Sequence, residues 1–170
     1  MTKSLTLEQV AQYESEGYLF PIDVMPEQEA LTYGHRLTEA EARYPEAINP
    51  YRRNNAHLAF LFLDEIVHHP RILDAVEDVI GANILVWGTV LFIKEARDPG
   101  FVSWHQDYTY MGLEPHDGVT AWLALSPSTE ARGCVQVLPG SHKHGIHPHR
   151  DSFDDHNILS RGQTIDDLDA

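Results

Sequence analysis

The spacing of apolar residues changes at Asn83, and this change constrains the fold more than any other feature of the chain. Before it, apolar residues recur at helical spacing, and the clearest stripe comprises Ile72, Leu73, Val76, Val79 and Ile80. After it, residues 83–94 are rich in β-branched and aromatic side chains, as a long strand should be. The sequence therefore predicts an α+β chain in which residues 1–82 are mainly helical and residues 83–170 form strands and loops.

Local signals place the ends of the expected helices. Thr6 is suited to cap the first helix, and Gly17 to end it. Pro26 stands near the start of a second helix with mostly polar positions. Pro70 begins the helix that carries the apolar stripe, and Gly81 closes it.

Four segments have the composition of strands, and their position after the helices suggests part of a jelly roll. Helices followed by antiparallel-type strands favour a jelly roll, which needs about eight strands. The chain therefore resembles the front half of such a fold, within a single domain over residues 1–170. From Pro139 onward the sequence looks loop-like. The four segments are residues 83–94, 102–107, 120–125 and 134–138.

Length and charge limit the partners that the chain can have. A chain of 170 residues is long enough for one domain with a buried core. Its 12 basic and 26 acidic residues give a net charge of −14. Such a surface repels phosphate backbones, so we expect no nucleic-acid partner. The acidity also has a simpler explanation in solubility.

Cysteine content and hydropathy suggest where the protein works. Cys134 is the only cysteine, which rules out an intrachain disulfide and suits a reducing compartment. The N-terminus has no charged-then-apolar signal pattern, and the apolar run over 84–93 is too short and broken to span a bilayer. We therefore expect a cytoplasmic protein without a membrane partner.

The motif with the clearest chemistry is His105-Gln106-Asp107. Residues two apart on an extended segment project from the same side, so the imidazole and the carboxylate can meet. Together they supply two adjacent ligands of a 2-His-1-carboxylate iron site, which leaves open positions for co-substrate and oxygen. A bare H-x-D motif can also be a chance hydrogen-bonded pair on the surface.

Several spaced motifs decide between these readings. From about Leu73 to His149 the chain resembles the phytanoyl-CoA dioxygenase family of iron(II)/2-oxoglutarate oxygenases. The matching motifs are Asp78-Val79-Ile80-Gly81, Trp104-His105-Gln106-Asp107, Ala121-Trp122-Leu123-Ala124-Leu125, and Gly133-Cys134 leading into Leu138-Pro139-Gly140-Ser141-His142.

The resemblance implies both a fold and an activity. The fold would be a double-stranded β-helix, a cupin-like jelly roll, with His105 and Asp107 as catalytic residues and iron ligands. Fe(II) would be the cofactor, 2-oxoglutarate and O2 the co-substrates, and succinate and CO2 the by-products of hydroxylating a small molecule. Halogenating relatives have a small residue where this chain has Asp107, so the resemblance implies a hydroxylase rather than a halogenase.

The same resemblance suggests residues around the ligands. Trp122, Gln106 and Val90 match positions that line the 2-oxoglutarate site, although Trp122 also suits a core tryptophan. Tyr108 and Tyr110 can face the substrate or serve as ordinary sheet aromatics.

Two polar segments also admit two interpretations each. Residues 52–57, including Arg52 and Arg53, could hold an anionic group at the barrel mouth or form a solvated loop. The histidine-rich residues 142–149 could bind a second metal weakly, or form a structured turn followed by a surface loop.

The family's second histidine ligand and its 2-oxoglutarate-binding arginine lie further downstream, and no residue here is assigned to them. We therefore expect the N-terminal portion of an oxygenase domain. The alternative is a catalytically incomplete metal-binding or interaction protein, a half-barrel that dimerises through exposed edges. A cupin-like binder fits less well, because cupins have H-x-H followed by glutamate. The acidity favours a small, zwitterionic substrate over a CoA thioester.

Overall fold

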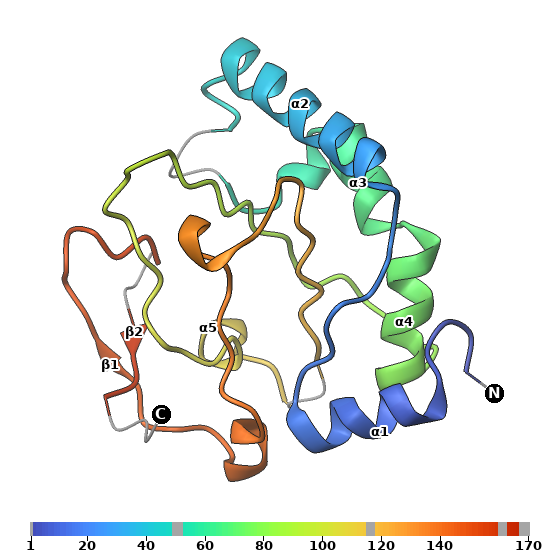
Figure 1. The fold of residues 1–170 in the computed structure, drawn as a ribbon. Coiled ribbons are helices and arrows are strands. Elements are labelled where there is room, and N and C mark those ends of the chain that lie inside the picture. Colours follow the sequence, from blue (N-terminus) through green and yellow to red (C-terminus); the bar gives the residue numbers. More distant parts are fainter. Residues whose placement is uncertain (1, 49–52, 115–117, 160–162, 167–170) are drawn as a thin grey trace.

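The computed structural model describes residues 2–48, 53–114, 118–159 and 163–166. The four longer helices lie along one side of the molecule, and the remainder consists mostly of irregular segments (Figure 1). None of the helices in these ranges is long and apolar enough to cross a membrane. The helices are α1 (Leu7–Glu16), α2 (Glu27–Arg43), α3 (Leu61–Val67), α4 (Pro70–Ile80) and α5 (Tyr108–Met111), with 3-10 turns η1 (Ala56–Leu58), η2 (Glu130–Arg132) and η3 (Ser141–His144).

Helices α1 and α4 begin and end where local signals predicted. The Thr6 hydroxyl accepts from Gln9 N at 3.2 Å, and Gln9 Oε1 accepts from Thr6 N at 2.8 Å, which completes a capping box. Gly17 closes α1 with a φ of 81°. Pro70 is the first residue of α4 and Gly81 caps its end. These caps confirm the predicted helical start of the chain.

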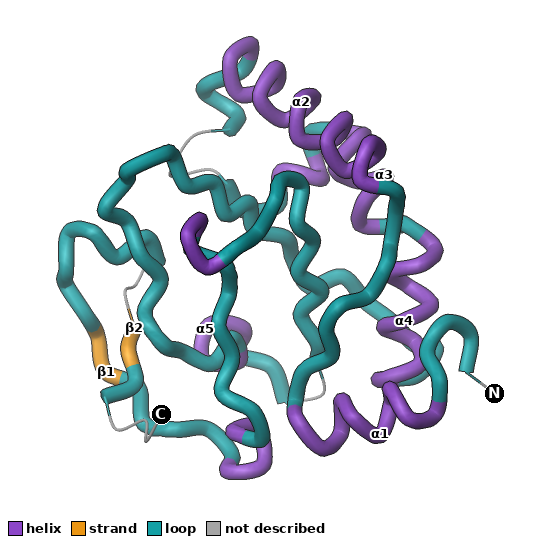
Figure 2. Tube along the Cα trace, in the orientation of Figure 1, coloured by secondary structure: helices purple, strands orange, loops and turns teal. Residues whose placement is uncertain are grey.

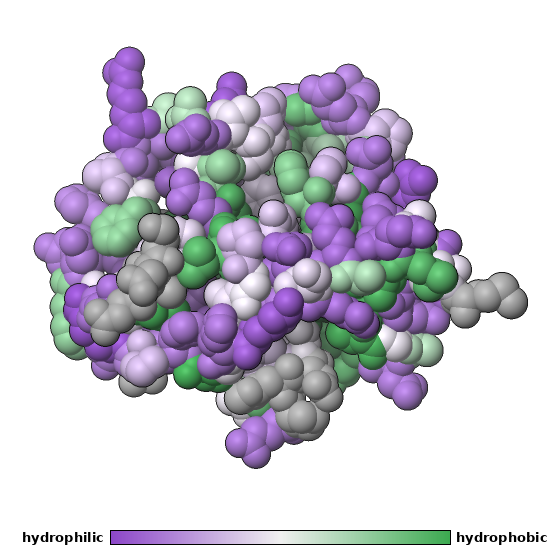
Figure 3. Space-filling model, turned by 60° about the horizontal axis from the view of Figure 1, so that its bottom comes forward, coloured by the Kyte–Doolittle hydropathy of each residue, from purple (hydrophilic) through white to green (hydrophobic). Residues whose placement is uncertain are grey.

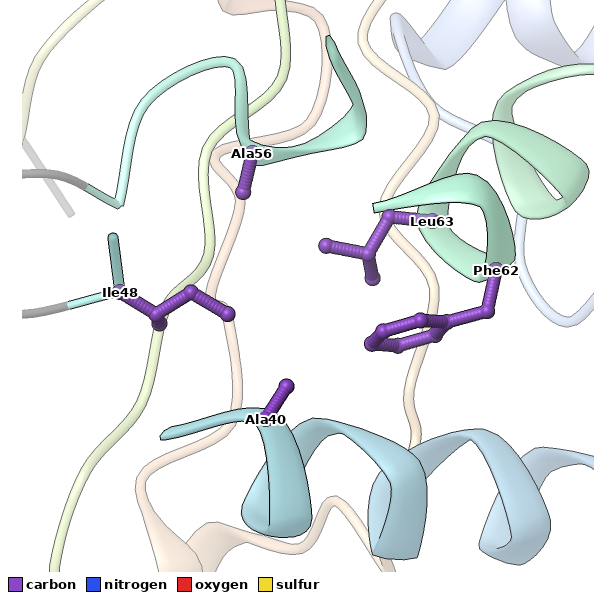
Figure 4. Packing of buried hydrophobic residues seen from close by; sticks show 5 residues of the cluster. All are labelled: Ala40, Ile48, Ala56, Phe62 and Leu63. Atoms are coloured by element: carbon purple, nitrogen blue, oxygen red, sulfur yellow. The ribbon is translucent and has the colours of Figure 1, made fainter. Parts of the chain in front are cut away.

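A small apolar core lies between α2, η1 and α3 (Figure 4). Its buried members come from segments on both sides of residues 49–52. Leu91, from the first predicted strand, packs against the cluster and so ties this strand to the helices. The buried members are Ala40, Ile48, Ala56, Phe62 and Leu63.

The start of the chain is fixed to the end of α4 by one carboxylate. Asp78 accepts hydrogen bonds from the backbone N–H groups of Lys3, Ser4 and Leu5 at 2.7, 2.8 and 2.8 Å. Lys3 Nζ also donates to Glu77 at 2.6 Å. This clamp places α1 across one end of α4 (Figure 1).

The four predicted strands are not formed as hydrogen-bonded strands, so the structure does not directly show the jelly roll expected for residues 83–170. The only pairing among the described residues of these segments is an isolated bridge between Val90 and Asn54; a second bridge joins Phe101, just before residues 102–107, to Asn157. The regular strands are β1 (Arg150–Asp151) and β2 (Gln163–Thr164), which pair antiparallel in a region predicted as loop. Figure 2 shows how short these two strands are. Strand propensity indicates only that side chains suit a pleated surface. A regular strand also needs a neighbouring segment with which it exchanges backbone hydrogen bonds.

The predicted strand segments leave several apolar side chains at the surface. Leu85, Val90, Trp122 and Val135 are 88, 52, 48 and 55% exposed. On the face in Figure 3, hydrophobic residues are interspersed among hydrophilic ones. The buried core therefore belongs mostly to the helical half, and the described residues after Asn83 contribute little to it.

Candidate metal site

The segment that carries His105 is held in place by the last described residues of the chain. Asn157 Nδ2 donates to Ser103 Oγ at 2.9 Å, and Ser103 Oγ in turn donates to the Gln163 carbonyl. Ile165 N donates to the Trp104 carbonyl at 3.0 Å. These contacts fix the backbone immediately before His105.

The fixed backbone also sets the tautomer of His105. Its Nδ1 lies 2.8 Å from the Ser103 carbonyl oxygen. A carbonyl only accepts, so the network assigns the hydrogen to Nδ1 and leaves a lone pair on Nε2. That lone pair faces Asp107 Oδ1 at 3.1 Å. Two acceptors that converge in this way need a proton or a metal cation between them.

The separation of these two atoms suits adjacent metal ligands. Nitrogen and oxygen ligands lie about 2.1 Å from a bound divalent metal, so two of them at a right angle are about 3.0 Å apart. In many metal sites, the ligating histidine donates its other ring N–H to a backbone carbonyl, and this hydrogen bond orients the ring. The donor set of His105 and Asp107 therefore fits part of a ferrous site.

Asp107 reaches His105 by a local turn and not by continuing a strand. It adopts a helical conformation, with φ −55° and ψ −34°, at the start of α5. Its Oδ2 accepts a hydrogen bond of 2.5 Å from the hydroxyl of Thr120. The sequence predicted that these two side chains meet, but it expected an extended backbone.

The two side chains stabilise each other's charged forms. Burial acts to lower the pKa of His105, but the hydrogen bonds to Asp107 and the Ser103 carbonyl outweigh it, and the pKa is raised. The hydrogen bond from His105 lowers the pKa of Asp107, against the effect of burial and with help from Thr120. In the metal-free protein the pair is therefore an attractive site for a cation or a proton.

Gln106 joins the ligand segment to the histidine-rich run. Its side-chain Nε2 donates to the Gly145 carbonyl at 2.9 Å, and its Oε1 accepts from His147 N at 2.7 Å. Its backbone N–H donates to His149 Nε2 at 2.9 Å. Both ends of the amide are thus engaged with the chain itself, and a contact between Gln106 and 2-oxoglutarate stays a prediction.

The other predicted pocket residues take different places. Tyr110 packs its ring edge-on against His105, with centroids 5.7 Å apart, so it supports the imidazole directly. Trp122 follows two residues after Thr120 and is about half exposed. Val90 is half exposed too and lies opposite Asn54. Cofactor contacts by Trp122 and Val90 stay predictions.

The structure bears on both polar segments that admitted two interpretations, residues 52–57 and residues 142–149. Arg53 donates to the Ile93 carbonyl at 2.9 Å and lies 4.0 Å from Glu41, so its guanidinium supports the fold. Arg52 lies outside the described residues. No group of three or more His, Cys, Asp or Glu side chains placed to hold a metal occurs in the described part of the chain, either at residues 142–149 or around His105.

A cavity of about 160 Å³ adjoins His105. Its walls come from the ligand segment, from residues 136–138 and from residues 16–18 at the end of α1. Polar side chains such as Gln136 and Tyr18 contribute to this lining. The cavity is large enough for part of a small molecule and lies beside the candidate ligand.

Comparison with known proteins shows which family and which individual proteins this chain is similar to. The model of the family described as phytanoyl-CoA dioxygenase (PhyH) matches residues 13–169. A probable phytanoyl-CoA dioxygenase from Caenorhabditis elegans is 28% identical over 172 residues, covering 85% of this chain and 55% of that protein. An ectoine dioxygenase from Bordetella parapertussis is 29% identical over 164 residues, covering 84% of this chain and 51% of that protein.

A third relative and a solved structure extend the comparison. A probable alpha-ketoglutarate-dependent hypophosphite dioxygenase from Stutzerimonas stutzeri is 31% identical over 99 residues, covering 58% of this chain and 34% of that protein. The structure of a non-heme monooxygenase in its apo form superposes with a TM-score of 0.77 at 31% identity, covering 95% of this chain and 60% of that one. The chain thus spans about half the length of the first two relatives.

Proposed function

Because the chain belongs to the phytanoyl-CoA dioxygenase family, we propose that it carries the metal-binding part of an Fe(II)/2-oxoglutarate-dependent hydroxylase. The observation that carries the proposal is the convergence of His105 Nε2 and Asp107 Oδ1 at 3.1 Å, with Nδ1 held by the Ser103 carbonyl. Bound Fe(II), with 2-oxoglutarate and O2, would supply the oxidising chemistry, releasing succinate and CO2.

In this proposal, the protein's own residues bind the metal and orient the groups around it. His105 and Asp107 hold the metal, and Tyr110 packs against the imidazole so that its ring direction is restricted. Trp122 and Val90 are proposed to line the 2-oxoglutarate site. Halogenating relatives have a small residue where this chain has Asp107, whose carboxylate would hold the metal, so the proposed reaction is hydroxylation.

The activity is proposed for the polypeptide that contains this chain. Its substrate is proposed to be a small, zwitterionic molecule that enters the cavity beside His105, because a net charge of −14 disfavours a large polyanion. A cytoplasmic location is proposed as well, because a lone cysteine, Cys134, which is free and half-buried, suits a reducing compartment.

One observation favours a second candidate. Several large apolar side chains between residues 83 and 159, including Leu85 and Val135, are exposed. Such a surface suits association with another protein, so the second candidate is a catalytically incomplete metal-binding or interaction protein that forms a homodimer. Light scattering separates the two possibilities, because a stable monomer at high concentration argues against association through this surface.

Anaerobic calorimetric titration with Fe(II) tests the proposed site. We expect binding by the wild-type chain and its loss in His105→Ala and Asp107→Ala. His68→Ala is the matched control, since His68 Nδ1 also lies near an aspartate, 3.2 Å from Asp64 Oδ1, but on an exposed helix end. Equal Fe(II) affinity in His105→Ala and His68→Ala would show that the iron site lies elsewhere.

A further inference from the structure

The carboxylate of Asp107 has two oxygens with different partners. Oδ1 faces His105 Nε2 at 3.1 Å, and Oδ2 lies 2.5 Å from the hydroxyl of Thr120. An ionised carboxylate only accepts, so the Thr120 hydroxyl must be the donor. Asp107 and Thr120 are 13 positions apart in the sequence, so this contact between different segments does not follow from the H-x-D motif itself.

The hydrogen bond matters because, in the described part of the chain, the carboxylate is otherwise held only by its contact with His105. Rotation about the terminal torsion of aspartate is broad and nearly two-fold, so either oxygen can face the imidazole. The Asp107 side chain is 45% exposed, which leaves it room to turn. A threonine side chain is stiff at its first torsion and therefore makes a well-directed donor.

We propose that Thr120 is a positioning residue that engages Oδ2 of Asp107 and so presents Oδ1 alone to the metal. This inference rests on the proposed function, since it concerns the same metal site. A hydrogen bond to an ionised acceptor is stronger than one between neutral groups, so it can hold one rotation of the carboxylate against solvent. Partners of this kind are as much part of a metal site as its ligands.

Titration with Co(II) alone, followed by its visible absorption, tests this role without turnover. Thr120→Val keeps the shape of the side chain and removes the donor, so we expect Co(II) affinity to fall about 10–100-fold and the band shape to change as the carboxylate turns. Thr120→Ser restores a donor and should recover most of the affinity. Thr109→Val is the control, because the Thr109 hydroxyl bonds the Gln106 carbonyl at 2.7 Å, close to the site but away from the carboxylate.

The outcomes separate the two proposals. If the wild-type chain shows no Co(II) binding that depends on His105, the proposed function fails and the role of Thr120 fails with it. If that binding is present but Thr120→Val matches Thr109→Val, only the positioning role is overturned. Equal losses in Thr120→Val and Thr120→Ser also overturn it, because they indicate that the position tolerates no change for reasons of packing.

Discussion

Replacing Gln106 with leucine removes both side-chain hydrogen bonds that tie the ligand segment to the histidine-rich run. The bonds to Gly145 O and from His147 N measure 2.9 and 2.7 Å, and the second is partly buried. Each is worth about 0.5–1.5 kcal/mol, so their loss should lower the free energy of unfolding by about 1–3 kcal/mol. The backbone bond from Gln106 to His149 survives the substitution.

Urea denaturation of the metal-free protein, followed by circular dichroism, measures this change. Gln28→Leu is the control, because Gln28 is exposed on α2 and its replacement should alter stability by less than about 0.5 kcal/mol. Hydrogen exchange at the amide of His147 provides a local readout. We expect this amide to lose protection in Gln106→Leu and to keep it in Gln28→Leu.

The result also distinguishes the two roles of Gln106. A residue that only contacts 2-oxoglutarate would leave the metal-free protein as stable as Gln28→Leu and weaken 2-oxoglutarate binding instead. That outcome, with an unchanged His147 amide, would refute the structural reasoning.

Three further substitutions test other parts of the molecule. Leu63→Ala removes a side chain that is 5% exposed in the core, and should cost about 2–5 kcal/mol in urea unfolding; a loss under about 1 kcal/mol would mean that this cluster is not the core. The backbone N–H groups bonded to Asp78 lower its pKa against the effect of burial, so its contribution is present above the ordinary aspartate pKa and disappears as pH falls through the lower folded value. Asp78→Asn should therefore flatten the stability curve below about pH 4, and an unchanged acid limb would contradict this. Asp107→Gly should abolish succinate-forming hydroxylation, and full activity in that variant would remove Asp107 from the metal.

Local sequence signals were sufficient to predict the helices but not to predict which segments form regular strands. The Thr6 cap and the Pro70 start act within one turn of the chain, so the sequence contains the whole signal. A strand depends on a partner that can lie far away in sequence. The segment 83–94 has strong strand propensity, yet the regular pairing forms between β1 and β2, where polar residues gave no such signal.

The residues of the candidate site were likewise only partly predictable from the sequence. The motif brought His105 and Asp107 together, and the structure has their side chains in contact. The supporting groups, among them Thr120 and Asn157, act across separations of 13 and 54 residues. The sequence does not indicate which distant group a threonine or an asparagine will contact, so these partners could be found only in the folded chain.

The most direct test of the central proposal is anaerobic addition of Fe(II) and 2-oxoglutarate to this chain, followed by visible absorption. The proposal predicts a weak charge-transfer band from the chelate, which is lost in His105→Ala and kept in His68→Ala. A wild-type chain that gives no band, or a band that survives His105→Ala, would contradict a working iron site at His105 and Asp107.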